Sequence, residues 1–202
     1  MPQRPVSDGG HTVFTDHRIA RRPPAEAIPP PSGQSETLVA WHQPPGALEQ
    51  RNLGLAEIEV GEKKKIFPMV AQGAKRLMEC SSNFPDDPPV LTGIGQVLLG
   101  LHHGKEAAAM FERAIHVEPD NPANYLHAAL AWKDAKEFQR AIENLEKALR
   151  LDPILEQPYL ELAEIYSAEQ QPEMVHLTYR RFLKAFPQSL EAQKDVQNSA
   201  SH

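Results

Sequence analysis

The sequence contains one cysteine, Cys80, and this scarcity excludes several kinds of protein. A disulfide framework, a zinc knuckle and an internal CxxC motif all need a second cysteine. The chain has no excess of basic charge either, since its formal net charge is −6. An acidic surface gains nothing from counterion release, so we expect no nucleic-acid partner. No apolar run approaches the roughly 18 residues that a membrane-spanning helix needs, so we also expect no membrane span.

Motifs that carry catalysis are missing as well. The sequence has no nucleophile elbow, no Gly-rich phosphate loop and no evident pair of catalytic carboxylates. We therefore predict no catalytic residues, no metal site and no enzymatic activity. Histidine is present, but His116, His127 and His176 fall at positions expected on helix surfaces. Cys80 falls among helical apolar positions, which favours a buried small hydrophobe over a reactive thiol.

Proline divides the chain into two unlike parts. Nine of the nineteen prolines lie in residues 1–46. Each proline lacks an N–H and fixes φ, so this stretch is predicted to be an extended, polyproline-like arm. Helical periodicity begins at about Gly46 and continues from there. The predicted organisation is therefore an arm at 1–45 and a helical domain at 46–202.

Residues 54–189 repeat with a period of 34 residues. The period is marked by Pro85, Pro119, Pro153 and Pro187. In each block two apolar stripes recur at i, i+3, i+4 and i+7, which predicts two amphipathic helices. Small residues fall in phase where these helices would cross. They are Gly95, Ala129 and Ala163 in the first helices, and Ala107 and Ala141 in the second.

The first block follows this pattern less closely than the others. Gly73, Leu77 and Cys80 place it in register, but Glu57 and Lys64 stand where other blocks carry aromatic residues. Its packing is therefore expected to be weaker, although long helices are still predicted at about 46–65 and 68–82.

The pattern resembles the tetratricopeptide repeat (TPR) family. The resemblance implies an all-α solenoid of about 3.5–4 helix–turn–helix repeats behind the extended arm. The repeats would span about 54–87, 88–121, 122–155 and 156–189. A short capping helix would follow, with Leu190 and Val196 on one face.

The TPR resemblance also implies a protein or peptide partner, held in a concave groove that the first helices line. By the family register the groove residues are Thr92, Gln96, Leu126, Leu130, Lys133, Leu160 and Glu164. Some of these leucines could instead pack only against neighbouring helices. TPR domains that hold a chaperone's C-terminal carboxylate present Lys and Asn in the groove. Here Leu and Glu take those positions, so an extended or helical peptide held by apolar contacts is favoured.

A second resemblance concerns the arm. The order Met1-Pro2, "HTVFTDHRIARRP", a proline-rich linker, "LVAWHQPP" and the repeats is similar to that of a class of bacterial multihaem c-type cytochromes with C-terminal TPRs. In that class a haem-attaching CxxCH often precedes the Met-Pro. This chain has no CxxCH, so we expect no covalent haem in it. The resemblance implies that Met1 is an internal methionine of a longer protein with haem c. It also implies that His17, or as second candidate His11, could be an axial haem ligand there.

Two functional hypotheses follow. The first is a non-enzymatic interaction module at the C-terminal end of a multihaem electron-transfer cytochrome, periplasmic or extracellular. The alternative is a self-standing cytoplasmic TPR adaptor with no haem connection. The sequence leaves open the partner's identity, the oligomeric state and whether the arm occupies the groove.

Overall fold

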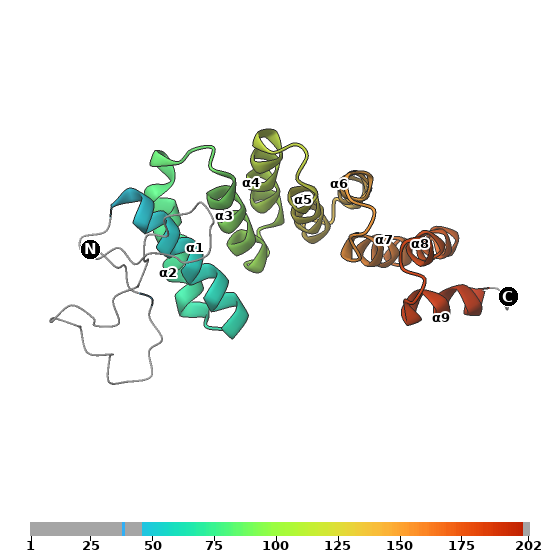
Figure 1. Ribbon diagram of the computed structural model, residues 1–202. Coiled ribbons are helices and arrows are strands. Elements are labelled where there is room, and N and C mark those ends of the chain that lie inside the picture. Colours follow the sequence, from blue (N-terminus) through green and yellow to red (C-terminus); the bar gives the residue numbers. More distant parts are fainter. Residues whose placement is uncertain (1–37, 39–45, 200–202) are drawn as a thin grey trace, which may run out of the picture. The chain divides into compact units, whose positions relative to one another are not determined.

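The computed structural model describes residue 38 and residues 46–199, which belong to one compact unit, Thr37–His202 (Figure 1). Every regular element in these residues is helical, which confirms the all-α solenoid. The helices are α1 (Ala47–Lys64), α2 (Phe67–Cys80), α3 (Pro88–Gly100), α4 (Gly104–Val117), α5 (Pro122–Asp134), α6 (Phe138–Leu151), α7 (Gln157–Ala168), α8 (Pro172–Ala185) and α9 (Leu190–Ser199), with a short 3₁₀ turn, η1 (Ser81–Asn83). None of the described helices is both long and apolar enough to cross a bilayer. The predicted arm, Leu38 excepted, lies outside the described residues.

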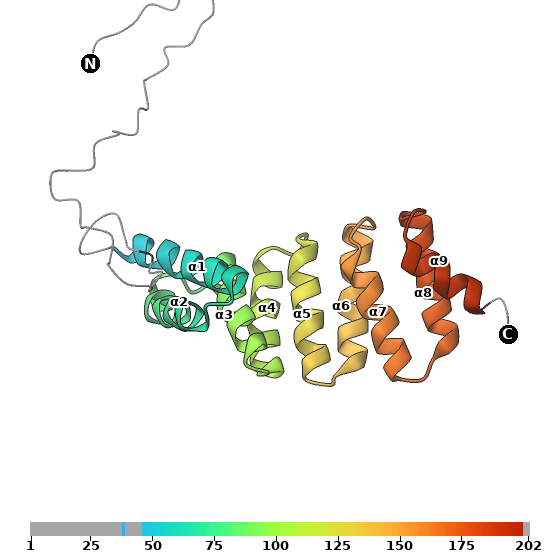
Figure 2. The ribbon, with the colours of Figure 1, turned by 90° about the horizontal axis from the view of Figure 1, so that it is seen from below.

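The helices form hairpins that follow one another in chain order (Figure 2). Several helices start with proline in the first turn, the position where its missing N–H costs nothing. Where the first helix of a hairpin ends, one residue takes a positive φ. His102, Lys136 and Gln170 hold this place at steps of 34 residues, with φ values of 60°, 61° and 57°. The left-handed residue stops each helix and reverses the chain.

Side chains of the following repeat close the corners at three of the predicted prolines. Tyr125, Tyr159 and Gln193 donate hydrogen bonds to the carbonyls of Pro119, Pro153 and Pro187, at 2.9, 3.0 and 2.8 Å. Leu91 holds the equivalent place after Pro85 and cannot donate. There Arg113 of α4 donates to the proline carbonyl instead. At three of the four corners the proline and its donor therefore recur together at the 34-residue period.

The first hairpin is out of register with the other three, which corrects the sequence prediction. The second helices begin at Phe67, Gly104, Phe138 and Pro172, so the first step is three residues longer than the later ones. The extra residues lie in the connection between α2 and α3, where Ser81–Asn83 form η1. Gly73, Leu77 and Cys80 therefore lie about one turn further along their helix than the residues they were aligned with.

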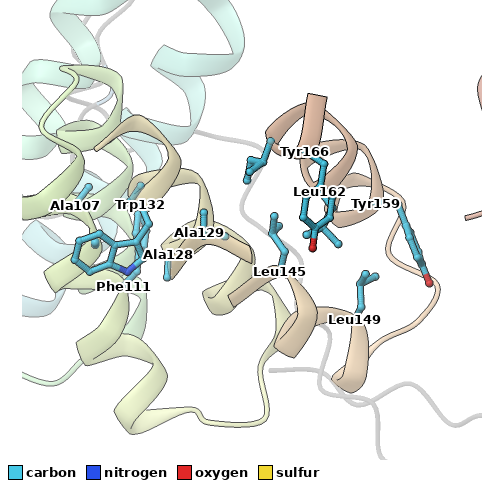
Figure 3. Close-up of a cluster of buried hydrophobic side chains, with 14 of the residues drawn as sticks. Ala107, Phe111, Ala128, Ala129, Trp132, Leu145, Leu149, Tyr159, Leu162 and Tyr166 are labelled. Carbon is cyan, nitrogen blue, oxygen red and sulfur yellow. The ribbon is translucent and has the colours of Figure 1, made fainter. Parts of the chain in front are cut away.

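The larger core cluster is shared by successive helices from α4 to α9. Figure 3 shows rings such as Phe111 and Trp132 beside small residues such as Ala107 and Ala129. The small residues predicted at helix crossings are all buried, as expected. A second cluster joins α1, α2 and α3 and contains Cys80, which is buried as predicted.

The capping helix exists, but it packs differently from the prediction. Leu190 is 71% exposed, whereas Ala192 is fully buried in the larger core. A methyl side chain lets α9 lie close to α8, while Leu190 stands at the start of the helix and points away from the contact.

The first hairpin is held by a charge pair in place of an aromatic contact. The Glu57 side chain is only 1% exposed, and its Oε2 accepts a hydrogen bond from Nε of Arg76 in α2 at 2.8 Å. Nη1 of Arg76 donates to Gln50 at 2.8 Å. Glu57, which stands where other blocks carry an aromatic residue, therefore forms a buried ion pair that joins α1 to α2.

Candidate partner-binding groove

A hollow of about 530 Å³ lies between α1, α3 and the start of α5, and we call it the α1–α3–α5 hollow. Its apolar lining comes from Leu55 and Ile58 of α1 and from Pro88 and Pro89 in the first turn of α3. The volume is in the range of ordinary ligand pockets, so the hollow suits a few side chains.

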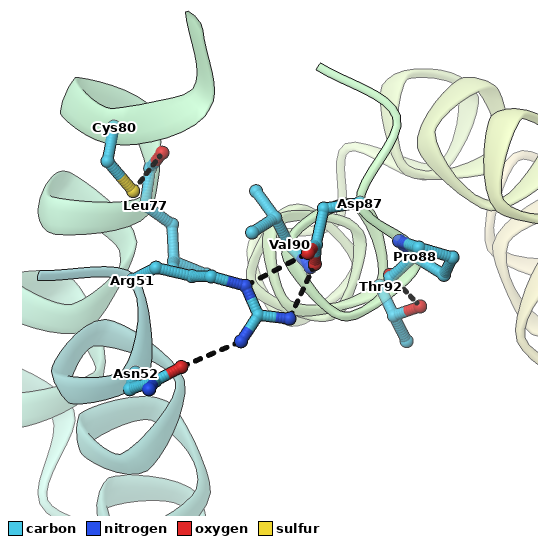
Figure 4. Close-up of polar contacts among 8 residues, drawn as sticks. All are labelled: Arg51, Asn52, Leu77, Cys80, Asp87, Pro88, Val90 and Thr92. Carbon is cyan, nitrogen blue, oxygen red and sulfur yellow. Dashed lines mark hydrogen bonds and ion pairs between the residues drawn. The ribbon is translucent and has the colours of Figure 1, made fainter. Parts of the chain in front are cut away.

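The walls of the hollow are fixed by one carboxylate. Asp87 caps α3, because its Oδ1 accepts the Val90 N–H at 3.1 Å. The same carboxylate binds the Arg51 guanidinium of α1 through two hydrogen bonds, at 2.8 and 3.0 Å (Figure 4). A bidentate pair of this kind fixes direction as well as distance. The N-terminus of α3 is thereby tied to α1.

The polar lining of the hollow is acidic. Glu59 and Glu62 come from α1, and Glu118 comes from the connection before α5. Glu118 is oriented by Asn121 and Asn124, whose amides donate to its Oε2 at 2.9 and 3.4 Å. Partial burial raises the pKa of Glu62. None of the described residues that line the hollow is Lys or Arg.

His127 also lines the hollow, which corrects its predicted place on the helix surface. Its ring stacks on Phe111 with centroids 5.3 Å apart, and it is half-buried. Its Nδ1 is inaccessible and has no hydrogen-bond partner among the described residues. Burial lowers the pKa of His127, since water no longer stabilises the charged ring. The sequence did carry a signal, because Asn124 and His127 lie three residues apart and share a face.

The residues predicted for the groove fall into two groups. Thr92 and Gln96 line the hollow, and the Thr92 hydroxyl donates to the Pro88 carbonyl at 2.7 Å (Figure 4). Lys133 lies further along the array and pairs with Glu164 and Glu161, at 2.6 Å each. Burial by itself would lower the pKa of Lys133, but the two carboxylates raise it overall.

The three predicted groove leucines lie outside the hollow. Leu126 and Leu160 pack partly against the larger core, and Leu130 is half-buried. Leu126 and Leu160 therefore contribute to helix packing, and the partly exposed surfaces of all three leucines also leave room for contact with a partner.

The candidate haem ligands His11 and His17 lie outside the described residues. Over residue 38 and residues 46–199, no group of three or more His, Cys, Asp and Glu side chains is placed to hold a metal ion.

The buried His127 predicts a specific pH dependence of stability. Its pKa is lowered in the folded chain, so below about pH 6.5 the unfolded chain binds a proton that the folded chain does not. Stability should fall as the pH falls from about 7.5 to 5.5, and His127→Phe should reduce this fall while keeping the stack on Phe111. Urea denaturation at both pH values measures it. The exposed His116→Phe serves as control, and equal pH dependence of the two variants would contradict the assignment.

Comparisons with solved structures show that proteins of known structure share this helical fold. MamA, residues 41 to the end, from Desulfovibrio magneticus RS-1 matches with a TM-score of 0.63 and 16% identity, over 72% of this chain and 78% of that chain. Another crystal structure of MamA gives a TM-score of 0.61 and 16% identity, over 79% and 84%. The Cut9–Hcn1 hetero-tetramer of the APC/C gives a TM-score of 0.61 and 18% identity, over 75% of this chain and 29% of that chain. No protein-family profile and no curated protein sequence matches the chain.

Proposed function

We propose that this chain is a non-enzymatic interaction scaffold that binds an extended segment of a partner protein along its first helices. The observation that carries the proposal is the α1–α3–α5 hollow, which is lined by both apolar and polar side chains and contains two of the predicted groove residues, Thr92 and Gln96. Stacked repeats commonly present such surfaces to partners, which supports the same function.

The charges along the first helices argue against recognition of a C-terminal carboxylate. Lys133 is the cation among the predicted groove residues, and Glu161 and Glu164 already hold it. The hollow itself has carboxylates in its lining. A peptide is therefore proposed to bind through internal side chains, with the apolar lining providing part of the contact.

A peptide-display selection against the full chain tests the proposal. We expect enriched peptides whose binding weakens by about tenfold or more in Gln96→Trp, because the indole would fill the hollow. Gln139→Trp is the matched control, since Gln139 is exposed on α6 and does not line the hollow. Absence of any enriched peptide, or binding that Gln96→Trp leaves unchanged, would overturn the proposal.

We propose further that this scaffold is the C-terminal module of a multihaem electron-transfer cytochrome, outside the cytoplasm. Support comes from the order of segments in residues 1–46, and His17 or His11 would supply an axial imidazole. Haem added to the full chain should then give a low-spin Soret band that His17→Ala or His11→Ala removes. A chain that gives no such band would favour the alternative, a cytoplasmic adaptor without a haem connection.

A further inference from the structure

We infer that the α1–α3–α5 hollow selects a Lys or Arg side chain of the bound segment, an inference that rests on the proposed peptide-binding function. The partner would therefore be a peptide with a basic residue flanked by uncharged ones.

Carboxylates near the hollow are paired with cations, but those that line it are not. Asp87 binds Arg51, and Glu57 binds Arg76. By contrast, Glu59 and Glu62 make no ion pair with any residue that the structure describes. Both lie on α1 and line the same hollow, so their charges act on whatever enters it. A cation supplied by a partner would pair with them as Arg51 pairs with Asp87 and Arg76 with Glu57.

The hollow also matches the shape of a basic side chain. Lys and Arg bury a methylene stem while their charged head seeks water or a carboxylate. Leu55 and Ile58 offer an apolar wall for the stem, and Glu59 and Glu62 lie on the same helix. Glu118, oriented by two asparagine amides, adds a third carboxylate from the opposite side. An acidic side chain would meet only like charge here.

The helix ends that border the hollow do not reverse this preference. Helix N-termini attract anions through their unpaired N–H groups. Here the Asp87 carboxylate accepts the Val90 N–H of α3, and the Asn121 side chain accepts the Ala123 N–H of α5 at 3.1 Å. Glu118 also places negative charge beside the start of α5, whereas the charge of Asp87 is paired with Arg51. The carboxylates that line the hollow therefore favour a cation there.

Two display libraries separate this inference from the proposed function. One library omits Lys and Arg, and the other omits Asp and Glu, and both are selected against the full chain. We expect enrichment from the library that contains Lys and Arg. A synthetic copy of an enriched peptide should bind about tenfold more weakly when its basic residue is replaced by glutamine.

Substitutions of the glutamates that line the hollow then test whether they bind the basic residue of the peptide. Glu62→Gln and Glu59→Gln should each weaken the basic peptide several-fold, and Glu62→Lys should abolish its binding. Glu112→Gln is the matched control, because Glu112 is exposed on α4 and does not line the hollow. Melting temperatures of all four variants show whether each still folds.

The two failures are distinguishable. Peptides without Lys or Arg that bind and are lost in Gln96→Trp would overturn the selection of a basic side chain and keep the groove. Basic peptides that bind equally to Glu59→Gln, Glu62→Gln and Glu112→Gln would also overturn it. An absence of enrichment from both libraries would overturn the proposed function as well.

Discussion

Arg76→Ala is expected to lower the free energy of unfolding by about 3–5 kcal/mol at neutral pH. The variant leaves the Glu57 carboxylate buried at 1% exposure without its cation. It also removes the hydrogen bond to Gln50. Because Arg76 joins α2 to α1, the loss should fall on the first hairpin, and urea denaturation followed by circular dichroism measures it.

The same variant should show a marked pH dependence. Burial raises the pKa of Glu57 in the folded chain, and Arg76 offsets part of that rise. A raised pKa means that the folded chain holds the proton more tightly than the unfolded chain, so stability falls as the pH rises through that range. Without Arg76 the pKa should rise further. The destabilisation should therefore shrink when the pH is lowered toward the ordinary range of glutamic acid.

Lys75→Ala is the matched control for Arg76→Ala. Lys75 is the preceding residue on α2, and its exposed pair with Glu79 spans 3.8 Å. An exposed pair of this kind contributes about 0.3–0.5 kcal/mol. A loss in Arg76→Ala no greater than that in Lys75→Ala would show that the buried pair does not stabilise the fold.

Phe111→Ala is expected to cost about 3–5 kcal/mol, the range for large-to-small changes in a packed core. Phe111 is fully buried in α4, and its ring fills the space left open by Gly95, where a Cβ would come within 2.7 Å of the ring. The ring also stacks on His127, which lines the hollow. Thermal and urea denaturation measure the loss, and an NMR titration should show the pKa of His127 returning toward its ordinary value.

Phe67→Ala gives the corresponding control for Phe111→Ala. Phe67 begins α2 and is 78% exposed, so its removal should change stability by less than about 0.5 kcal/mol. Equal effects of the two substitutions would contradict the packing described for α4. Phe111→Leu should lie between them, since it keeps part of the buried volume.

The fold was predictable because its determinants recur. Small residues at helix crossings must return with the same period as the prolines and the donors that bind their carbonyls. Because these residues recur at a fixed spacing, the repeat can be detected in a single sequence. The three-residue offset of the first hairpin leaves no such trace, because η1 replaces a regular connection with polar residues that resemble any loop.

The candidate site was less predictable than the fold. Family register identified Thr92 and Gln96, since these lie in a block that keeps the period. The sequence did not predict that α1 lines the hollow, because Glu59 and Glu62 belong to the first block, which is out of register with the others. His127 was misplaced because exposure depends on the ring of Phe111, which comes from a different helix. The pairing of Lys133 with Glu164 likewise joins α5 to α7 across a distance in sequence.

The hydrogen bonds to the proline carbonyls between repeats make the stabilisation of the array directional. At Pro119, Pro153 and Pro187 the carbonyl accepts a hydrogen bond from a side chain of the helix that follows it, so each of these helices stabilises the turn before it. Gln193 of α9 does for Pro187 what Tyr125 does for Pro119. The last helix thus takes the place of the first helix of a further repeat. Loss of α9 would leave the Pro187 carbonyl without this hydrogen bond, and unfolding would then begin at the C-terminal end of the array.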